Sequence, residues 1–301
     1  MPGPAADPPA RGSVGLVGPG RSGAVVAAAL VRADHLVTGW SGRDPVSAAA
    51  LDRMMRLLPG IPQLPIADLV DVSDIVLLAV PDAAVAGTAE AIAGLPASTR
   101  AGSAFWHLSG ATGVRALAPL RAPTGPGLLA LHPAMTFTGT AADVPRLAGV
   151  TWACTYDERS SGLAHALVLD LGGRPVDLDE DDRPRYHAAL SHASNFLAVL
   201  QAQAADLLRS VGVADPSAML GPLVRSALAN AMLDEPAYTG PISRGDAATI
   251  QAHLATFDDP DTALTYAALS SATLHRLTAA GVLDEPAARA VAAVLAGRPE
   301  S

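Results

Sequence analysis

Apolar runs separated by helix-like segments follow one another through the first half of the chain. The first run, Ser13–Val17, passes through a glycine-rich turn at Gly18–Gly23 into an Ala/Val/Leu segment that ends at Leu30 and has the composition of a helix. Further strands are predicted at His35–Trp40, Asp74–Val80, Ala104–His107, Gly127–His132, Val150–Cys154 and Arg174–Leu178. Nearly continuous apolar runs are typical of strands buried on both faces of a parallel sheet. The pattern therefore predicts an α/β domain with a doubly wound parallel sheet.

The second half of the chain has helical composition and no convincing strand. Its start is marked by the charged, proline-containing stretch Asp179–Pro184. A long helix is predicted over Tyr186–Val211, because its apolar residues recur at helical spacing. We therefore divide the chain into a loose Pro/Ala-rich tail at residues 1–11, an α/β domain at residues 12–178 and an all-helical domain at residues 183–301.

The turn Gly18–Gly23 has the Gly-x-Gly-x-x-Gly spacing and lies between a predicted strand and a predicted helix. In this context the motif signals dinucleotide binding: the first glycine allows the tight turn, the second lets a pyrophosphate approach the backbone, and the third lets the helix pack closely. The N–H groups that open the helix then face the phosphates. The alternative is a glycine-rich turn that binds nothing. The residues predicted to bind the cofactor here are Gly18, Pro19, Gly20, Arg21, Ser22 and Gly23.

The end of the second predicted strand bears on the choice between NAD and NADP. NAD-binding sites usually place Asp or Glu there to bind the ribose 2′-hydroxyl. This chain has Ser41, Gly42 and Arg43, and a hydroxyl and a guanidinium can bind a 2′-phosphate. NADP(H) is therefore the predicted cofactor. Asp44 follows at once and leaves two alternatives open, a pairing with Arg43 or a contact with the ribose of NAD.

Polar residues also follow the next three predicted strands, at the edge where open α/β sheets bind their ligands. Asp82 is expected to cap the helix that follows it. The next two strands deliver His107 and His132, and two such histidines suggest a polar site, although a single strand-end histidine is usually structural. The residues predicted near the ribose and nicotinamide are Val80, Pro81, Asp82 and Ser109.

The long helix carries a polar stripe. His187, Ser191 and Asn195 are spaced four apart and share one helical face, with His192 beside Asn195. Such a stripe is either a solvated face or the wall of a cleft, and the adjacent apolar stripe favours a cleft. Farther along, Arg244 lies on a loop bracketed by Gly and Pro, where it could grip a small carboxylate or pair locally with an aspartate.

Composition limits the classes of protein that remain. Apolar runs are all interrupted before about 18 residues, so no transmembrane helix is expected. A net charge of −9 argues against broad nucleic-acid binding. One cysteine, Cys154, excludes an intrachain disulfide and suits a reducing cytoplasm. All 20 basic residues are arginine, so no lysine can donate a proton, form a Schiff base or bind a phosphate.

Motifs along nearly the whole chain resemble a family of bacterial proteins that join a Rossmann-like half to an all-helical domain called DUF2520, built like the 6-phosphogluconate dehydrogenase superfamily. The matching segments are Gly18–Gly23, Val80–Asp82, His107–Gly110, Leu131–Pro133 with Phe137, and Thr239–Pro241 with Arg244–Asp246. Relatives of this architecture include ketopantoate reductases and pyrroline-5-carboxylate reductases, and one alternative class of ketopantoate reductase is similar to the DUF2520 proteins. The resemblance implies an NADPH-dependent reductase of a small 2-oxo acid or imine that forms a homodimer through its helical domain.

The usual ketopantoate reductases and the β-hydroxyacid dehydrogenases place a catalytic lysine near an asparagine on the helix that connects the domains. This chain has no lysine, so the proton must come from another group. Histidine is the natural donor near neutral pH, and we favour His132 with His192 as the second choice. Asn195 could hydrogen-bond the substrate carbonyl, and Arg244, from the same chain or from a partner subunit, could hold the substrate carboxylate.

Other classes of protein remain open at this point. A non-catalytic regulatory protein could keep the NADP(H) site, although the strand-end histidines argue mildly against it. A methyltransferase that uses S-adenosylmethionine has a similar glycine-rich turn, but usually needs an acidic residue where Arg43 lies. A metal-dependent hydrolase is disfavoured because the histidines and carboxylates show no close ligand pair.

Overall fold

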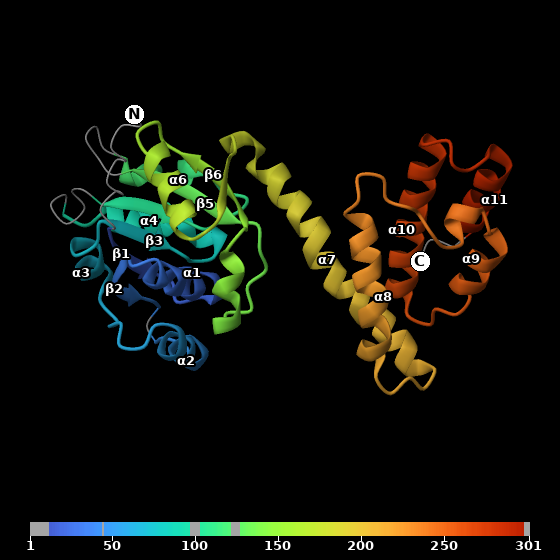
Figure 1. Cartoon of the computed structure of the whole chain (residues 1–301), viewed down its shortest axis with the longest axis horizontal. Helices are drawn as coiled ribbons and strands as arrows, with labels where there is room; N and C mark the ends of the chain where they lie inside the picture. Colours follow the sequence, from blue (N-terminus) through green and yellow to red (C-terminus); the bar gives the residue numbers. More distant parts are fainter. Residues whose placement is uncertain (1–11, 44, 97–102, 122–126, 298–301) are drawn as a thin grey trace, which may run out of the picture. The chain divides into compact units, whose positions relative to one another are not determined.

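The computed structural model describes residues 12–43, 45–96, 103–121 and 127–297. The predicted tail at residues 1–11 and the ambiguous Asp44 lie outside these described residues. The chain forms two compact units, Met1–Phe196 and Leu197–Ser301 (Figure 1).

The first unit is built on a seven-stranded sheet with the order β2-β1-β3-β4-β5-β6-β7. Its strands are β1 Ser13–Val17, β2 Leu36–Ser41, β3 Ile75–Leu78, β4 Ala104–His107, β5 Leu128–Pro133, β6 Thr151–Tyr156 and β7 Arg174–Asp177. All seven predicted strands are therefore present. Because β1 pairs with β2 on one side and β3 on the other, the strand order reverses at β1, where sheets of this kind bind their ligands.

The doubly wound α/β fold is confirmed, with one difference from an all-parallel sheet. Neighbouring strands are parallel except β5 and β6, which pair antiparallel with His132 opposite Ala153. The connection between them contains only the 3₁₀ turns η3 (Ala141–Asp143) and η4 (Pro145–Leu147). A parallel pair needs a crossover, usually a helix, whereas antiparallel neighbours do not.

Helices connect the other strands of this unit except β4 and β5, whose connection contains a 3₁₀ segment in its described part. They are α1 Arg21–Arg32, α2 Ala48–Leu57, α3 Ile66–Asp71, α4 Val85–Ala93 and α6 Ser161–Asp170.

The predicted cap by Asp82 is wrong. Asp82 instead opens the 3₁₀ turn η1 (Asp82–Ala84), and Ala84 precedes α4 without a side-chain cap. A side chain caps a helix only from the position directly before it, and the intervening turn removes Asp82 from that position.

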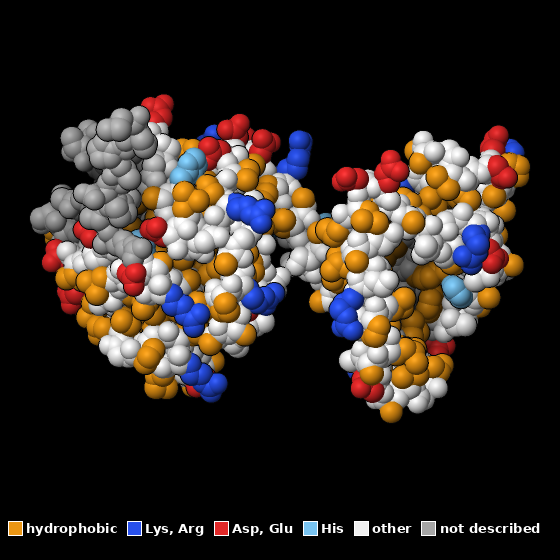
Figure 2. All heavy atoms as spheres, in the orientation of Figure 1, with side chains coloured by type: hydrophobic (Ala, Val, Ile, Leu, Met, Phe, Trp, Pro, Cys, Tyr) orange, Lys and Arg blue, Asp and Glu red, His pale blue; other side chains and the backbone are white. Residues whose placement is uncertain are grey.

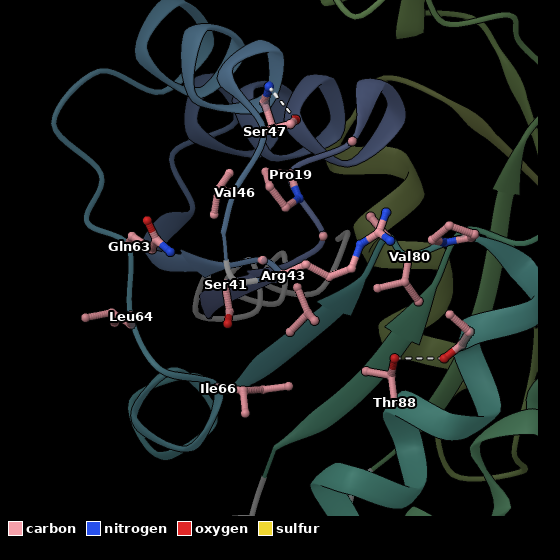
Figure 3. Close-up of a pocket in the computed structure, with 18 of the residues that line it drawn as sticks. Pro19, Ser41, Arg43, Val46, Ser47, Gln63, Leu64, Ile66, Val80 and Thr88 are labelled. Carbon is pink, nitrogen blue, oxygen red and sulfur yellow. Dashed lines mark hydrogen bonds between the residues drawn. The ribbon is translucent and has the colours of Figure 1, made fainter.

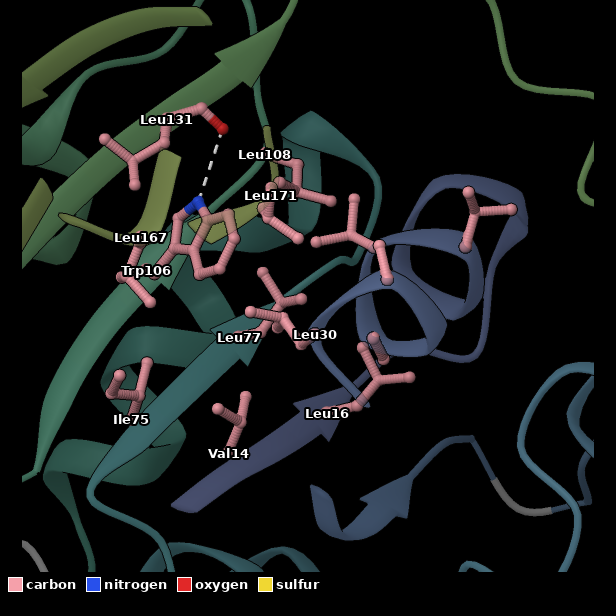
Figure 4. Close-up of a cluster of buried hydrophobic side chains, with 14 of the residues drawn as sticks. Val14, Leu16, Leu30, Ile75, Leu77, Trp106, Leu108, Leu131, Leu167 and Leu171 are labelled. Atoms are coloured by element: carbon pink, nitrogen blue, oxygen red, sulfur yellow. Dashed lines mark hydrogen bonds between the residues drawn. The ribbon is translucent and has the colours of Figure 1, made fainter. Parts of the chain in front are cut away.

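Two apolar clusters cover the two faces of the sheet. Successive strand residues alternate between them: Trp106 belongs to the cluster that includes α1 and α6, and Phe105 belongs to the one that includes α3, α4 and the 3₁₀ segment η2 (Val114–Leu120). Trp106 is fully buried, and its indole N–H donates to the carbonyl oxygen of Leu131 at 3.3 Å (Figure 4). This indole ties β4 to β5 at the centre of the sheet.

The helical half begins with α7, Arg183–Ser210, which follows the 3₁₀ turn η5 (Glu180–Asp182). The remaining elements are α8 Pro216–Ala231, the 3₁₀ turn η6 Ile242–Arg244, α9 Ala247–Leu254, α10 Pro260–Ala279 and α11 Glu285–Ala296. The predicted cap of α9 is confirmed, because Asp246 Oδ1 accepts the N–H of Thr249 at 3.0 Å. The division between the compact units lies within α7, so the first turns of this helix belong with the sheet.

Candidate functional site

The glycine turn after β1 has the geometry that its motif requires at two positions. Gly18 has φ +96°, and a Cβ atom there would lie 2.6 Å from the carbonyl oxygen of Ala79. A Cβ atom at Gly23 would lie 2.5 Å from the Cβ of Ala79, so only glycine lets α1 pack this closely against the end of β3. At Gly20 the nearest atom to a built Cβ is 3.6 Å away, which leaves the backbone open to an approaching ligand. The turn is therefore tight where it packs and open where a phosphate would approach.

A cleft of about 1430 Å³ lies over this turn, at the ends of β1, β2 and β3 (Figure 3). Seven of the predicted cofactor residues line it: Gly18, Pro19, Gly20, Ser41, Arg43, Val80 and Pro81. Five others are not among the residues that line it: Arg21, Ser22, Gly23, Asp82 and Ser109. Figure 3 shows the side chain of Arg43 extending into the cleft toward Val80. The structure thus brings together the glycine turn, the end of β2 and the end of β3.

A second arginine in the cleft was missed by the sequence analysis. Arg53, on α2, lines the cleft, and its Nη1 donates to the carbonyl oxygen of Pro19 at 2.9 Å. The helix that carries it begins after Ser47, whose hydroxyl accepts the N–H of Ala50. No motif marks Arg53, because its contact with the turn depends on how α2 packs and not on a local spacing.

The cleft is electrostatically suited to an anion. Its lining among the described residues contains two arginines, Arg43 and Arg53, and no Asp or Glu. It also meets the N-terminus of α1, where Gly20 provides no side-chain cap for the N–H groups of the first turn. Uncapped N–H groups and the helix dipole favour negative charge at such a position.

A polar cluster lies at the ends of β4 and β5, along the same edge of the sheet. We call it the His132 cluster, and it consists of His107, His132, Arg183, Tyr186 and His187. His132 Nδ1 and the Tyr186 hydroxyl are 2.8 Å apart, and the His132 ring meets the ring of His187 edge to face at 5.9 Å. The first turns of α7 therefore bring two aromatic polar side chains onto the strand end that carries His132.

Arg183 fixes the start of α7 in this place. Its side chain is fully buried, and its guanidinium donates to the carbonyl oxygens of Ser109 at 3.0 Å and Ala130 at 3.3 Å and to Thr155 Oγ1 at 3.0 Å. All three partners are neutral oxygen atoms, so a positive charge is held at the ends of β4 and β5. In the sequence, Arg183 stands out only as part of a charged domain boundary, and this role was not predicted.

The two strand-end histidines of the cluster differ in function. His107 is fully buried; its Nδ1 accepts the N–H of Ser109 at 3.1 Å, so the proton lies on Nε2, which donates to the carbonyl oxygen of Gly113 at 3.0 Å. Both ring nitrogens are used by the backbone, and His107 is therefore structural. Burial first, and then Arg183 and His187, lower the pKa of His132 to about 4. His132 is thus a neutral imidazole near pH 7.

The other predicted catalytic residues lie elsewhere. His192 and Asn195 are exposed farther along α7, and the His192 ring packs against Phe196 at 5.6 Å. Asn195 is eight residues beyond His187, about 12 Å along the helix axis. Nearby, the Ser194 and Thr136 hydroxyls are 3.2 Å apart, which joins α7 to the segment after β5. Arg244 ends η6 in the second unit and is exposed.

Neither a metal centre nor a membrane-spanning helix is found among the described residues. No group of three or more His, Cys, Asp or Glu residues gathers there in a way that could hold a metal ion. No helix in the described part of the chain is long and apolar enough to cross a membrane.

Solved structures share this fold at low sequence identity. A proposed NADP oxidoreductase of Bacteroides fragilis matches with a TM-score of 0.72 and 21% identity, covering 87% of this chain and 97% of that one. Pyrroline carboxylate reductase of Plasmodium falciparum, solved with NADP bound, has a TM-score of 0.55 and 12% identity over 94% and 97% of the two chains. An imine reductase variant of Myxococcus stipitatus, in complex with NAD⁺, has a TM-score of 0.54 and 15% identity over 87% and 94%. At these identities the likeness shows the fold alone.

Family models match both halves of the chain. A Rossmann-like domain matches residues 2–133, and the domain of unknown function DUF2520 matches residues 150–273. A comparison with curated proteins finds no similar sequence. The chain therefore joins a Rossmann-like domain to a DUF2520 domain.

Proposed function

We propose that the protein is an NADP(H)-dependent oxidoreductase that reduces a small 2-oxo acid similar to ketopantoate. One observation supports NADP(H) as the cofactor. The cleft over the glycine turn has two arginines, an uncapped helix N-terminus and, in the described part of its lining, no carboxylate. A dinucleotide with an extra phosphate fits this charge distribution. The names of the similar structures, which include NADP- and NAD-binding reductases, support the same reading.

Each part of the cleft would hold a different part of the cofactor. The backbone of Gly18–Gly20 and the first N–H groups of α1 would bind the pyrophosphate. Ser41 and Arg43 would bind the 2′-phosphate, with Arg53 as a second cation beside the turn. Val80 and Pro81, at the end of β3, would adjoin the nicotinamide half. When bound, the reduced cofactor supplies the hydride that the substrate carbon accepts.

The substrate would bind at the ends of β4 and β5, where His132 lies. The strand order β1-β3-β4-β5 places this edge next to the cleft. His192 as the second-choice proton donor, Asn195 as a hydrogen-bond donor to the substrate carbonyl and Arg244 as the partner of the substrate carboxylate stay proposals. None of the three belongs to the His132 cluster. An imine is the second candidate substrate, since pyrroline carboxylate reductase and an imine reductase share the fold.

A screen of NADPH oxidation at 340 nm tests the reaction, with ketopantoate, pyrroline-5-carboxylate and related small acids as substrates. We expect turnover with at least one 2-oxo acid. Turnover confined to imines would instead support the second candidate. Tight NADPH binding without oxidation across the panel would favour a non-catalytic regulatory protein.

Replacing Arg43 with alanine should weaken NADPH binding about tenfold to a hundredfold, because a charge-assisted hydrogen bond contributes roughly 1.5–3 kcal/mol. The affinity for NADH, which lacks the 2′-phosphate, should stay the same. Arg56→Ala is the matched control: Arg56 is exposed on the neighbouring helix α2 and pairs with Asp52 at 2.9 Å. Equal losses for both dinucleotides, or no loss for NADPH, would remove Arg43 from the 2′-phosphate site.

The second unit exposes an apolar helix, which supports the proposed homodimer. Of the 16 residues of α8, only Pro216 is buried. Its exposed apolar side chains include Met219 at 57%, Leu223 at 65% and Leu228 at 49% exposure. Figure 2 shows hydrophobic side chains exposed over the visible face of this unit. A helix with so little buried surface needs a partner, and we propose that a second copy of the chain covers it.

Leu223→Glu should therefore convert the dimer into a monomer, measured by light scattering after size-exclusion chromatography. A carboxylate buried in an apolar interface is costly, and the dissociation constant should rise at least about a hundredfold. Leu169→Glu is the control, because Leu169 is 60% exposed on α6 of the first unit. A wild-type chain that is monomeric at micromolar concentration would contradict the dimer.

A further inference from the structure

The hydroxyl of Tyr186, like the guanidinium of Arg183, is a polar group of the His132 cluster that neither the motifs nor the resemblance assigned to the site. It lies 2.8 Å from His132 Nδ1, and the two rings meet edge to face at 5.6 Å. Tyr186 belongs to the first turns of α7, which Arg183 fixes onto the ends of β4 and β5. The Tyr186 hydroxyl therefore lies beside the end of β5, in contact with His132.

The backbone encloses the other edge of the His132 ring. A Cβ atom at Gly110 would lie 3.0 Å from His132 Nε2 and 2.6 Å from His187 Cδ2. The chain at Gly110 thus passes close to both rings, and only glycine fits between them. Nδ1 is the ring nitrogen with a side-chain partner, and that partner is the half-buried phenol of Tyr186.

The charges around the pair suit a phenol that releases its proton during a reaction. His132 faces Arg183, His187, His107 and Asp82, and the net effect with burial keeps its pKa at about 4. Burial raises the pKa of Tyr186 to about 12, while Arg183 acts in the opposite direction and stabilises the phenolate. Near neutral pH the phenol of Tyr186 is therefore protonated and the imidazole of His132 is neutral. The buried guanidinium of Arg183 can stabilise the negative charge that develops on the phenolate.

We propose that Tyr186 is the proton donor of the reduction and that His132 is a positioning residue whose Nδ1–H holds the phenol oxygen. This inference rests on the proposed function. It assigns the donated proton to the phenol of Tyr186 and not to the imidazolium of His132, the donor expected from the sequence. As hydride reaches the carbonyl carbon, the C=O π pair moves to oxygen and the O–H bond of Tyr186 breaks to protonate it. The phenolate keeps its hydrogen bond from His132 Nδ1–H and takes a proton from water afterwards.

A phenol is the better donor here for a chemical reason. A neutral imidazole releases its N–H proton far less readily than a phenol, and His132 is neutral throughout the range in which most reductases work. The phenol can give its proton to a developing alkoxide and leave a phenolate stabilised by an N–H donor and by Arg183.

The first test needs neither substrate nor cofactor. In ¹⁵N-histidine NMR spectra of the full chain, assigned with His132→Ala, we expect His132 to carry its proton on Nδ1 between pH 6 and 8. If His132 carries its proton on Nε2, its Nδ1 accepts the hydrogen bond and the O–H of Tyr186 donates it. This result would overturn the proposal. This readout stays valid even where the proposed reduction fails.

The second test uses the substrate found in the screen. Tyr186→Phe should lower kcat roughly 10²–10⁴-fold with KM and the NADPH dissociation constant unchanged. Wild-type kcat should be flat between pH 5 and 9, because neither His132 nor Tyr186 titrates there. His132→Asn, which can offer an N–H near the Nδ1 position, should recover part of the activity lost in His132→Ala. Tyr238→Phe is the control, since Tyr238 is 46% exposed in the second unit.

Three results of this second test would overturn the assignment of Tyr186: wild-type kcat in Tyr186→Phe, a kcat that falls tenfold per pH unit between pH 5 and 8, or an equal loss in Tyr238→Phe. A failure of the proposed function looks different. In that case the wild-type chain would either not bind NADPH or bind it without reducing any substrate of the panel, whereas a failure of Tyr186 alone leaves NADPH binding and reduction intact.

Discussion

Replacing Gly18 with alanine is expected to weaken NADPH binding by about 10- to 100-fold, equivalent to roughly 1.4–2.7 kcal/mol. Gly18 has φ +96°, a conformation that side-chain-bearing residues rarely adopt, and the added methyl group would lie 2.6 Å from the Ala79 carbonyl oxygen. The turn must shift to relieve this contact, and it then no longer presents its N–H groups to the pyrophosphate. Strain of this kind also costs about 1–3 kcal/mol of folding stability. The NADPH titration and urea unfolding measure the two effects separately.

Gly162→Ala is the matched control for that change. Gly162 lies in α6, and no atom lies within 4 Å of a Cβ built there. Alanine is favoured over glycine in a helix by roughly 0.5–1 kcal/mol, so this variant should be slightly more stable and bind NADPH like wild type. Wild-type NADPH affinity in Gly18→Ala would show that the turn does not form the pyrophosphate site.

Replacing Trp106 with alanine should lower the free energy of unfolding by about 3–5 kcal/mol. Trp106 is fully buried on β4, its ring centroid lies 6.1 Å from that of Trp152, and its N–H donates to the Leu131 carbonyl. The substitution leaves a cavity on one face of the sheet and removes the side-chain link between β4 and β5. The loss should appear as a lower midpoint in urea-induced unfolding with an unchanged slope.

Met55→Ala is the control for Trp106→Ala, because it removes a large side chain from an exposed position. Met55 is 67% exposed on α2, and its replacement should change stability by less than about 0.5 kcal/mol. A Trp106→Ala variant that loses less than about 1 kcal/mol would contradict the placement of Trp106 in the core.

Much of the fold could be predicted from the sequence because its signals are local. The run that contains β3 is apolar on both faces, and the glycine turn sits between a strand and a helix, so both could be read without tertiary information. The antiparallel pairing of β5 and β6 could not, because it depends on a connection that has no crossover helix. The cap at Asp82 failed for a similar reason: a short 3₁₀ turn inserted before α4 has no sequence signal of its own.

The candidate site divides in the same way. The glycine turn and Arg43 follow from a motif and its spacing, and His132 follows from its place at a strand end. Arg53 and Tyr186 belong to the site only because of how α2 and α7 pack. No spacing of residues in the sequence predicts such tertiary contacts. The protonation state of His132 also depends on tertiary structure, because burial and the cation of Arg183 determine it together.

The central claim is that the cleft over Gly18–Gly23 binds a dinucleotide that carries a 2′-phosphate. Calorimetric titration of the wild-type chain with NADPH, NADH and S-adenosylmethionine tests it most directly. We predict saturable binding of one NADPH per chain, weaker binding of NADH and none of S-adenosylmethionine. Saturable binding of S-adenosylmethionine alone, or of none of the three, would contradict the account.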